Sequence, residues 1–307
     1  MSKKLGGAFL VLVTPLDEDN KQDNESLSKL VGYYLKAGVS GFTILGESSE
    51  IDKLTQKEKE DNLAIVKERV RGKVPLVFGT SQEGTQKAVE ESVWAEQQGA
   101  DGLMIAPPKN VKLRDDAIFN YYAEINDKIN IPIIVQDYPQ TNHPYMSPNL
   151  ISRINSELPQ AQYLKLEDPP TPIKLTKVKE LVGENMKIFS ALGAKSYLWD
   201  LDRGAIGVMT ASPTPEYLVG IWNAHQDNNR EKALEIFWRY LTLIHFYEEG
   251  YGISVRKNVL QMRGIIKTAN MKIPGPELDN KGKKELAELL KWVETEIQNK
   301  TGLFPMR

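Results

Sequence analysis

The sequence contains no cysteine and only three histidines among its 307 residues. Without cysteine the chain can form no disulfide bond, no thiolate metal site and no cysteine nucleophile. Positive charge is not in excess either, because 39 lysine and arginine residues face 41 aspartate and glutamate residues, for a formal net charge of -2. No basic face is therefore indicated, and a nucleic-acid partner is not expected.

Long apolar runs are also missing. No segment approaches the roughly 20 apolar residues that a membrane helix needs. The short run at residues 8–13 ends at Thr14-Pro15 without a small-residue cleavage site, so no secretory signal is predicted. These features predict a cytoplasmic protein that does not associate with membranes. With 41% hydrophobic residues, the chain is long enough for one large core.

Strand-like and helix-like segments alternate regularly through the first 227 residues. Short apolar runs indicate strands, and each is followed by a segment with helical periodicity. Thr55 followed by Glu58 has the spacing of a capping box, which predicts a helix start at residue 56. The predicted strands are 9–13, 42–45, 75–79, 103–106, 132–136, the run around Lys165, 187–191 and 206–209. The predicted helices are 25–37, 56–70, 85–98, 114–129, 147–156, 172–181, 195–202 and 213–224.

Eight such units predict an α/β fold, a closed TIM (β/α)8 barrel that forms a catalytic domain over residues 1–227. An open, doubly wound sheet is the alternative architecture. It calls for a glycine-rich dinucleotide turn after the first strand, where this chain has Thr14-Pro15-Leu16-Asp17. From residue 228 the strand patterns stop, which predicts a C-terminal helical extension, 228–307, packed on the barrel. Its helical patterns cover 232–247, 254–267 and 284–298.

Lys165 lies in the apolar run Tyr163-Leu164-Lys165-Leu166, where the pattern predicts a buried barrel strand. Burying an ammonium group is costly, and a buried neutral amine is a nucleophile toward carbonyl carbons. Side chains alternate along a strand, so Tyr163, Lys165 and Glu167 share one face. Two other interpretations stay open: an internal ion pair with Glu167 or Asp168, or a side chain that extends outward to solvent.

Several segments occur in the order found in one enzyme family. Gly46-Glu47-Ser48-Ser49-Glu50 follows the second strand, Tyr138-Pro139 follows the fifth, Lys165 lies in the sixth, and the seventh is glycine-rich. The whole chain thereby resembles the dihydrodipicolinate synthase / N-acetylneuraminate lyase family. The resemblance implies a Schiff-base lyase, an aldolase or dehydratase of pyruvate or a small 2-keto acid, that forms a homo-oligomer, a dimer or tetramer. Lys165 would attack the substrate ketone to give an imine, and neither a metal nor an organic cofactor would be needed.

Two segments depart from the family pattern. The family loop after the second strand reads Gly-Thr-Thr-Gly-Glu and holds the keto-acid carboxylate, whereas this chain keeps a hydroxyl at Ser48, adds a carboxylate at Glu47 and replaces a glycine with Ser49. The family's proton-relay tyrosine at the end of the fifth strand is replaced by Gln136, which cannot transfer a proton as an acid or base. A standard dihydrodipicolinate synthase is therefore not expected. The alternative is a family member that binds a keto acid or a related metabolite without turning it over.

Tyr138 and Glu47 are the candidates to replace the missing tyrosine. Tyr138 would share the face of Gln136 if the strand continued, and Glu47 is a possible carboxylate base. Tyr138 can equally be a packing residue and Glu47 a helix-entry charge. The candidate catalytic residues are Lys165, Tyr138 and Glu47. The candidate substrate-binding residues are Ser48, Ser49, Gln136, Ser190, Gly193 and Thr210, although small residues at these positions serve close packing equally well. No metal site is predicted, because adjacent acids on a strand face opposite ways and no histidine supports them.

Overall fold

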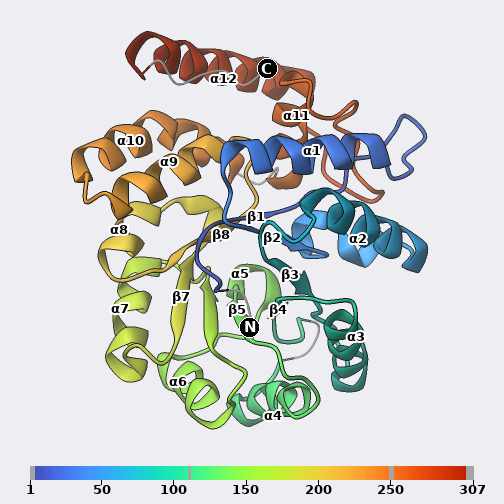
Figure 1. Ribbon diagram of the computed structural model, residues 1–307, viewed down its shortest axis with the longest axis vertical. Helices are drawn as coiled ribbons and strands as arrows, with labels where there is room; N and C mark the ends of the chain where they lie inside the picture. Colours follow the sequence, from blue (N-terminus) through green and yellow to red (C-terminus); the bar gives the residue numbers. More distant parts are fainter. Residues whose placement is uncertain (1–3, 110–111, 249–251, 302–307) are drawn as a thin grey trace. The chain divides into compact units, whose positions relative to one another are not determined.

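Eight parallel strands form a closed barrel in the order β1 to β8 (Figure 1). The protein is described here by a computed structural model that covers residues 4–109, 112–248 and 252–301. The predicted TIM barrel is thus confirmed. The strands are β1 (Gly7–Val11), β2 (Gly41–Ile44), β3 (Leu76–Gly79), β4 (Gly102–Ile105), β5 (Ile133–Asp137), β6 (Tyr163–Leu166), β7 (Lys187–Ser190) and β8 (Gly207–Thr210).

Strand β1 begins two residues earlier than the sequence pattern predicts. The amide of Gly7 donates to the carbonyl of Ile206 at 2.8 Å, and the amide of Ser40 donates to the carbonyl of Ala8 at 2.8 Å. These bonds join β1 to the segments that lead into β8 and β2, so the barrel closes at Gly7 rather than at Phe9. Hydrogen bonding, which periodicity does not detect, sets this boundary.

The chain divides into two compact units. The first comprises Met1–Phe9, Ser40–Gly46 and Val74–Thr210. Its helices are α3 (Thr85–Gln97), α4 (Asp115–Asn126), α5 (Pro139–Asn142), α6 (Pro148–Glu157), α7 (Thr171–Val182) and α8 (Tyr197–Asp202). Helix α5 is not predicted from the sequence, because four residues are too few to show a helical period.

The second unit comprises Leu10–Val39, Glu47–Lys73 and Ala211–Arg307. Its helices are α1 (Asn24–Ala37), α2 (Gln56–Val70), α9 (Pro215–Gln226), α10 (Arg230–Tyr247), α11 (Gly252–Met262) and α12 (Asn280–Thr301). Helix α10 packs against α9, and α12 packs against α10 and α11 (Figure 1). The C-terminal helices are thus confirmed, while a domain boundary at residue 227, between α9 and α10, stays a prediction.

Helix α11 ends at Met262, five residues before the predicted end at residue 267. Gly264 adopts a φ of 65°, in the left-handed region that glycine tolerates best. The amides of Gly264 and Ile265 bond back to the carbonyls of Gln261 and Leu260, so the last turn is closed by a glycine C-cap.

Aromatic rings in the first unit fill the barrel around the Lys165 strand. The ring centroids of Phe9 and Phe189 lie 5.4 Å apart, and those of Tyr163 and Phe189 lie 6.2 Å apart. A Cβ atom at Gly41 would come within 2.3 Å of the Phe9 ring, so any larger residue there would force this ring to move. Tyr163 precedes Lys165 by two residues and Phe189 is its partner in β7, so both rings share the face of the lysine.

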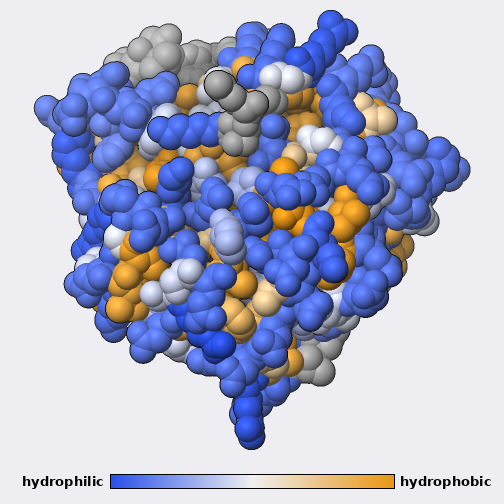
Figure 2. Space-filling view, turned by 60° about the horizontal axis from the view of Figure 1, so that its bottom comes forward, coloured by the Kyte–Doolittle hydropathy of each residue, from blue (hydrophilic) through white to orange (hydrophobic). Residues whose placement is uncertain are grey.

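One face of the molecule is mostly hydrophilic (Figure 2). On this face, hydrophobic residues form several separate patches between hydrophilic ones. Within residues 4–109, 112–248 and 252–301, no helix is both long enough and apolar enough to cross a bilayer.

Candidate active site

Lys165 is buried on strand β6, with 5% of its surface exposed. Gln136 of β5 and Phe189 of β7 are its register partners. The Nζ atom of Lys165 lies 3.0 Å from Oε2 of Glu167. The interpretation as an internal ion pair with Glu167 is therefore confirmed, and the interpretation in which the side chain extends to solvent is wrong.

Glu167 is the partner of both polar groups on this face. The Nε2 atom of Gln136 donates to Oε2 of Glu167 at 2.7 Å. Lys165 and Gln136 thus both contact the same carboxylate oxygen, Oε2. The backbone amide of Glu167 donates to the carbonyl of Asp137 at 2.9 Å, which holds the end of β6 against β5.

The candidate residues derived from the sequence do not include Glu167. Its spacing of two residues from Lys165 predicts that both side chains share one face of the strand. This spacing alone does not predict a role for Glu167 in catalysis. The structure brings Lys165, Gln136 and Glu167 together as one buried hydrogen-bonded group in the first unit.

Ser190 and Thr210 are not on this face of the barrel. Ser190 is fully buried, and its hydroxyl donates to Oδ2 of Asp200 on α8 at 2.6 Å. Ser190 pairs in register with Val208 of β8, whereas its neighbour Phe189 pairs with Lys165, so alternation directs Ser190 toward the helices. The same alternation places Thr210 on the face of Val208.

The Asp200 carboxylate accepts hydrogen bonds from two hydroxyl groups, the first being that of Ser190. This carboxylate also accepts the hydroxyl of Thr171 at 3.2 Å. Burial raises the pKa of Asp200 to about 6, although the hydrogen bonds from Ser190 and Thr171 act in the opposite direction. This group ties the end of β7 to the first residue of α7.

Gly193 and Tyr138 lie in turns that follow strands. Gly193 has a φ of 65° and lies between Leu192 and Ala194, which also have positive φ values of 49° and 66°. Glycine adopts this left-handed turn without the steric cost that its two neighbours bear. Strand β5 ends at Asp137, and Tyr138 leads into α5 with φ -132° and ψ 69°. The strand alternation that grouped Tyr138 with Gln136 therefore stops one residue short of it.

The loop after β2 lies mostly in the second unit. Its turn Glu47–Ser49 has an exposed Glu47, a half-buried Ser48 and a buried Ser49. The hydroxyl of Ser49 donates to the carbonyl of Leu12 at 2.7 Å, and the carbonyl of Ser49 accepts the hydroxyl of Thr14 at 2.8 Å. Ser49 thus uses its only hydroxyl proton to hold the turn, while substrate contacts at Glu47 and Ser48 stay predictions.

Glu50 anchors the same loop to the C-terminal segment of the second unit. Its Oε2 lies 2.5 Å from Nζ of Lys257, and its Oε1 accepts the amide of Lys272 at 2.9 Å. Lys257 is fully buried and also donates to the carbonyl of Asn270 at 2.8 Å. Burial lowers the pKa of Lys257, although Glu50 opposes the shift.

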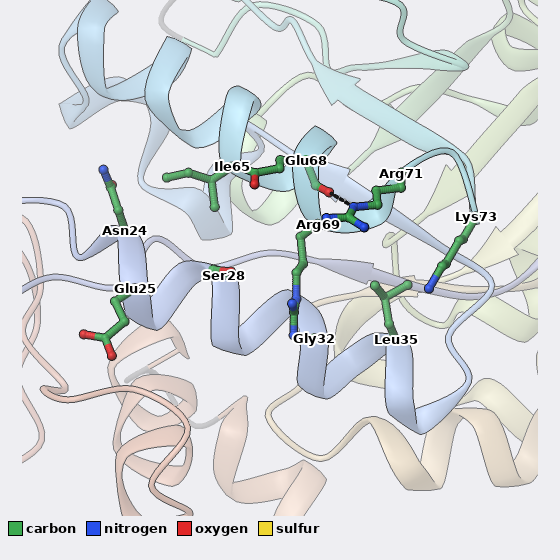
Figure 3. A pocket seen from close by; sticks show the side chains of 10 residues that line it. All are labelled: Asn24, Glu25, Ser28, Gly32, Leu35, Ile65, Glu68, Arg69, Arg71 and Lys73. Carbon is green, nitrogen blue, oxygen red and sulfur yellow. Dashed lines mark hydrogen bonds between the residues drawn. The ribbon is translucent and has the colours of Figure 1, made fainter.

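A polar cavity of about 570 Å³ lies between α1 and α2 in the second unit (Figure 3). Arg69 lies across α1 at Gly32, where a Cβ atom would meet the guanidinium at 2.5 Å. Cations and carboxylates both line this cavity, and none of the candidate site residues does. In the part of the chain that the structure describes, no group of three or more histidine, aspartate or glutamate side chains is arranged to hold a metal ion.

Comparisons with known proteins agree with this fold. The sequence pattern of the Dihydrodipicolinate synthetase family matches residues 4–293. The L-2-keto-3-deoxyarabonate dehydratase of Azospirillum brasilense is 30% identical over 284 residues, which cover 91% of this chain and 92% of that protein. The 4-hydroxy-tetrahydrodipicolinate synthase of Fervidobacterium nodosum is 27% identical, with 85% of this chain and 89% of that protein covered.

A solved structure extends the likeness to three dimensions. The crystal structure of dihydrodipicolinate synthase from Rhodopseudomonas palustris superposes with a TM-score of 0.87 at 29% identity, and the match covers 94% of this chain and 97% of that one. Its barrel thus corresponds to the barrel that carries Lys165, Gln136 and Glu167. The chain belongs to the dihydrodipicolinate synthetase family.

Proposed function

We propose that the protein is a Schiff-base lyase, an aldolase or dehydratase, that acts on pyruvate or a small 2-keto acid through Lys165. One observation carries the proposal: a buried lysine on a barrel strand lies 3.0 Å from a carboxylate that can take its proton. Family membership and the sugar-acid dehydratase relative support a lyase acting on keto acids.

The first step makes the amine nucleophilic. Glu167 Oε2 accepts a proton from the Lys165 ammonium, and the neutral amine attacks the ketone carbon of the substrate. The resulting carbinolamine loses its hydroxyl group as water, with a proton returned from Glu167, and an iminium ion remains. Gln136 cannot exchange protons, so its role in this proposal is to orient Glu167 through the bond at 2.7 Å.

The second step uses the iminium ion as an electron sink. A base removes a proton from the carbon next to the iminium carbon, and the electron pair forms an enamine. The enamine then expels a hydroxyl group from the following carbon, as water after protonation, which gives a conjugated iminium ion. Hydrolysis of this iminium ion by a water molecule releases the dehydrated keto acid and frees the Lys165 amine. The Glu167 carboxylate, beside Lys165, is the group proposed for these proton transfers. Tyr138 and Glu47 stay further candidates for the same task.

The proposed substrate class is a 2-keto-3-deoxy sugar acid. The dehydratase relative supports this choice, and the missing relay tyrosine argues against the synthase reaction. Ser48, whose hydroxyl lies in the turn after β2, stays a candidate substrate-binding residue. We further propose a cytoplasmic homo-oligomer that works without a metal or an organic cofactor, because imine chemistry requires neither.

Borohydride trapping tests the imine. The protein is incubated with pyruvate or with each of a panel of 2-keto acids and is reduced with borohydride. The mass of the intact protein is then measured by mass spectrometry. A covalent adduct that is lost in Lys165→Ala supports the proposal, whereas no adduct with any member of the panel refutes it. Each keto acid that forms an adduct is then incubated with the protein without borohydride. The reaction mixture is analysed for a product whose mass is lower by one water molecule.

Binding without turnover is the second candidate function. Gln136 in place of an acid or base favours it, because the usual relay group is absent. An adduct that forms with several keto acids, combined with no product from any of them, would support this alternative over the lyase.

A further inference from the structure

Lys174 is a second buried lysine of the first unit, and it contacts the residues that follow Gln136 and Glu167 in the chain. Lys165, Gln136 and Glu167 are called the Lys165 group below. Lys174 is the fourth residue of α7 and only 6% exposed, on the apolar face that also carries Leu175 and Val178. A cation in the first turn of a helix opposes the helix dipole, and a lysine is rarely buried unless it is paired. The position therefore needs compensation from other segments.

Three segments provide this compensation. The Nζ atom of Lys174 lies 2.7 Å from Oδ2 of Asp137, 2.8 Å from Oδ2 of Asp168 and 2.7 Å from the carbonyl oxygen of Met146. The ring of Tyr145 lies 4.5 Å from the same atom. Lys174 thus donates hydrogen bonds to Asp168, after β6, and to the carbonyl of Met146, before α6, and forms an ion pair with Asp137 on β5.

Two of these acceptors are direct neighbours of the groups that contact Lys165. Asp137 follows Gln136 on β5, and Asp168 follows Glu167 just after β6. Adjacent residues of a strand face opposite ways, so Lys174 contacts the end of β5 from the side opposite Gln136, and it contacts the segment after β6 through Asp168. A shift of either strand end would change the distances within the Lys165 group.

The charges couple the two lysines as well. Three carboxylates, on Asp137, Glu167 and Asp168, accompany two ammonium groups in this region. Burial raises the pKa of Asp137 to about 6; Lys174 opposes the shift, and Asp168 and Glu167 add to it. From α4, buried Tyr122 is also in electrostatic contact with Asp137. Without Lys174, this region would hold three carboxylates and only one ammonium group, that of Lys165.

We propose that Lys174 is a positioning residue for the imine chemistry, which holds Gln136 and Glu167 beside Lys165 and balances the charge of the buried carboxylates. The proposal rests on the proposed function of Lys165. Lys174 acts through Asp137 and Asp168 and need not touch the substrate.

The test is the rate of borohydride-trapped adduct formation, measured against pH for Lys174→Met, Lys174→Arg and the control Lys177→Met. Lys177 lies on the exposed face of the same helix. We expect Lys174→Met to slow trapping by about 100-fold through misplacement of the reacting groups. Its pH profile should also change, because Lys174 no longer opposes the raised pKa of the neighbouring Asp137 carboxyl. Lys174→Arg should restore the position of the profile, and Lys177→Met should match the wild type.

A double variant covers the case in which Lys174→Met does not fold. Lys174→Met/Asp137→Asn removes one positive and one negative charge together, so the net charge of the group is unchanged. We expect this variant to fold and to trap slowly, with the pH profile near that of the wild type. Wild-type trapping rates in every folded Lys174 variant would overturn the inference, whereas absence of an adduct in the wild type would instead refute the proposed function.

Discussion

Glu167 is the residue on which the proposed chemistry depends most. We expect Glu167→Gln to slow imine formation by about 10²–10⁴-fold, because the neutral amide cannot take a proton from Lys165. Trapping with borohydride at a fixed time checks this, with the unfolding midpoint as a measure of folding. Gln136→Leu is the comparison: it removes only the orienting bond, and we expect a smaller loss of rate. Equal rates for Glu167→Gln and wild type would exclude Glu167 as the proton acceptor.

The raised pKa of Asp200 predicts that the stability of the fold, and not the catalytic rate, depends on its protonation. Its pKa is about 6 in the folded protein against an ordinary 3.8, so the folded state binds the proton more tightly than the unfolded state does. Stability is therefore lost as pH rises from about 4 to about 6, by up to roughly 3 kcal/mol for a shift of about two units. Urea unfolding of Asp200→Asn at pH 4 and pH 7 should lack this loss.

The exposed Asp127 supplies the control for that measurement. Asp127→Asn should keep the wild-type difference between pH 4 and pH 7. If Asp200→Asn shows the same difference as wild type, the carboxyl of Asp200 does not titrate in this range.

At the scale of elements, the start of α2 offers a direct test of a sequence signal. Thr55 and Glu58 form the predicted capping box: the Glu58 amide donates to the Thr55 hydroxyl at 3.2 Å, and the Thr55 amide donates to Glu58 Oε2 at 2.9 Å. We expect Thr55→Ala to lower the free energy of unfolding by about 1 kcal/mol. Thr55→Ser retains the hydroxyl and should stay close to wild type. A Thr55→Ala protein as stable as Thr55→Ser would show that the cap contributes nothing.

The elements also show where sequence reasoning succeeds and where it stops. Periodicity predicts all eight strands, since a buried parallel strand is a short apolar run between turn signals. It places Lys165 and Glu167 correctly on one face, because two-residue alternation follows from strand geometry alone. The position of Ser190 at a strand end predicts a substrate contact. Only the register with β6 and β8 reveals that its hydroxyl faces Asp200.

At the scale of the whole molecule, contacts between distant segments are what the sequence pattern misses most. The sequence pattern places Lys174 and Lys257 in helices. No neighbouring residue in the chain indicates that either side chain is buried. Their acceptors come from other elements: Asp137 and Asp168 for Lys174, and Glu50 for Lys257. Such pairings depend on how the elements fold together, which local propensity does not determine.

The Glu50–Lys257 pair joins residues 207 positions apart in the second unit and predicts a large stability effect. We expect Lys257→Met to destabilise the protein by about 3–5 kcal/mol, because it leaves the buried Glu50 carboxylate with only the more distant Lys53 ammonium, 3.6 Å from Oε1. Lys257→Met/Glu50→Gln removes both charges, keeps an acceptor for the Lys272 amide, and should regain most of that loss. Lys291→Met, on the exposed face of α12, is the matched control and should stay within about 0.5 kcal/mol of wild type. Urea unfolding of the four proteins decides the matter: a double variant no more stable than Lys257→Met would mean that the lysine contributes through packing and not through charge.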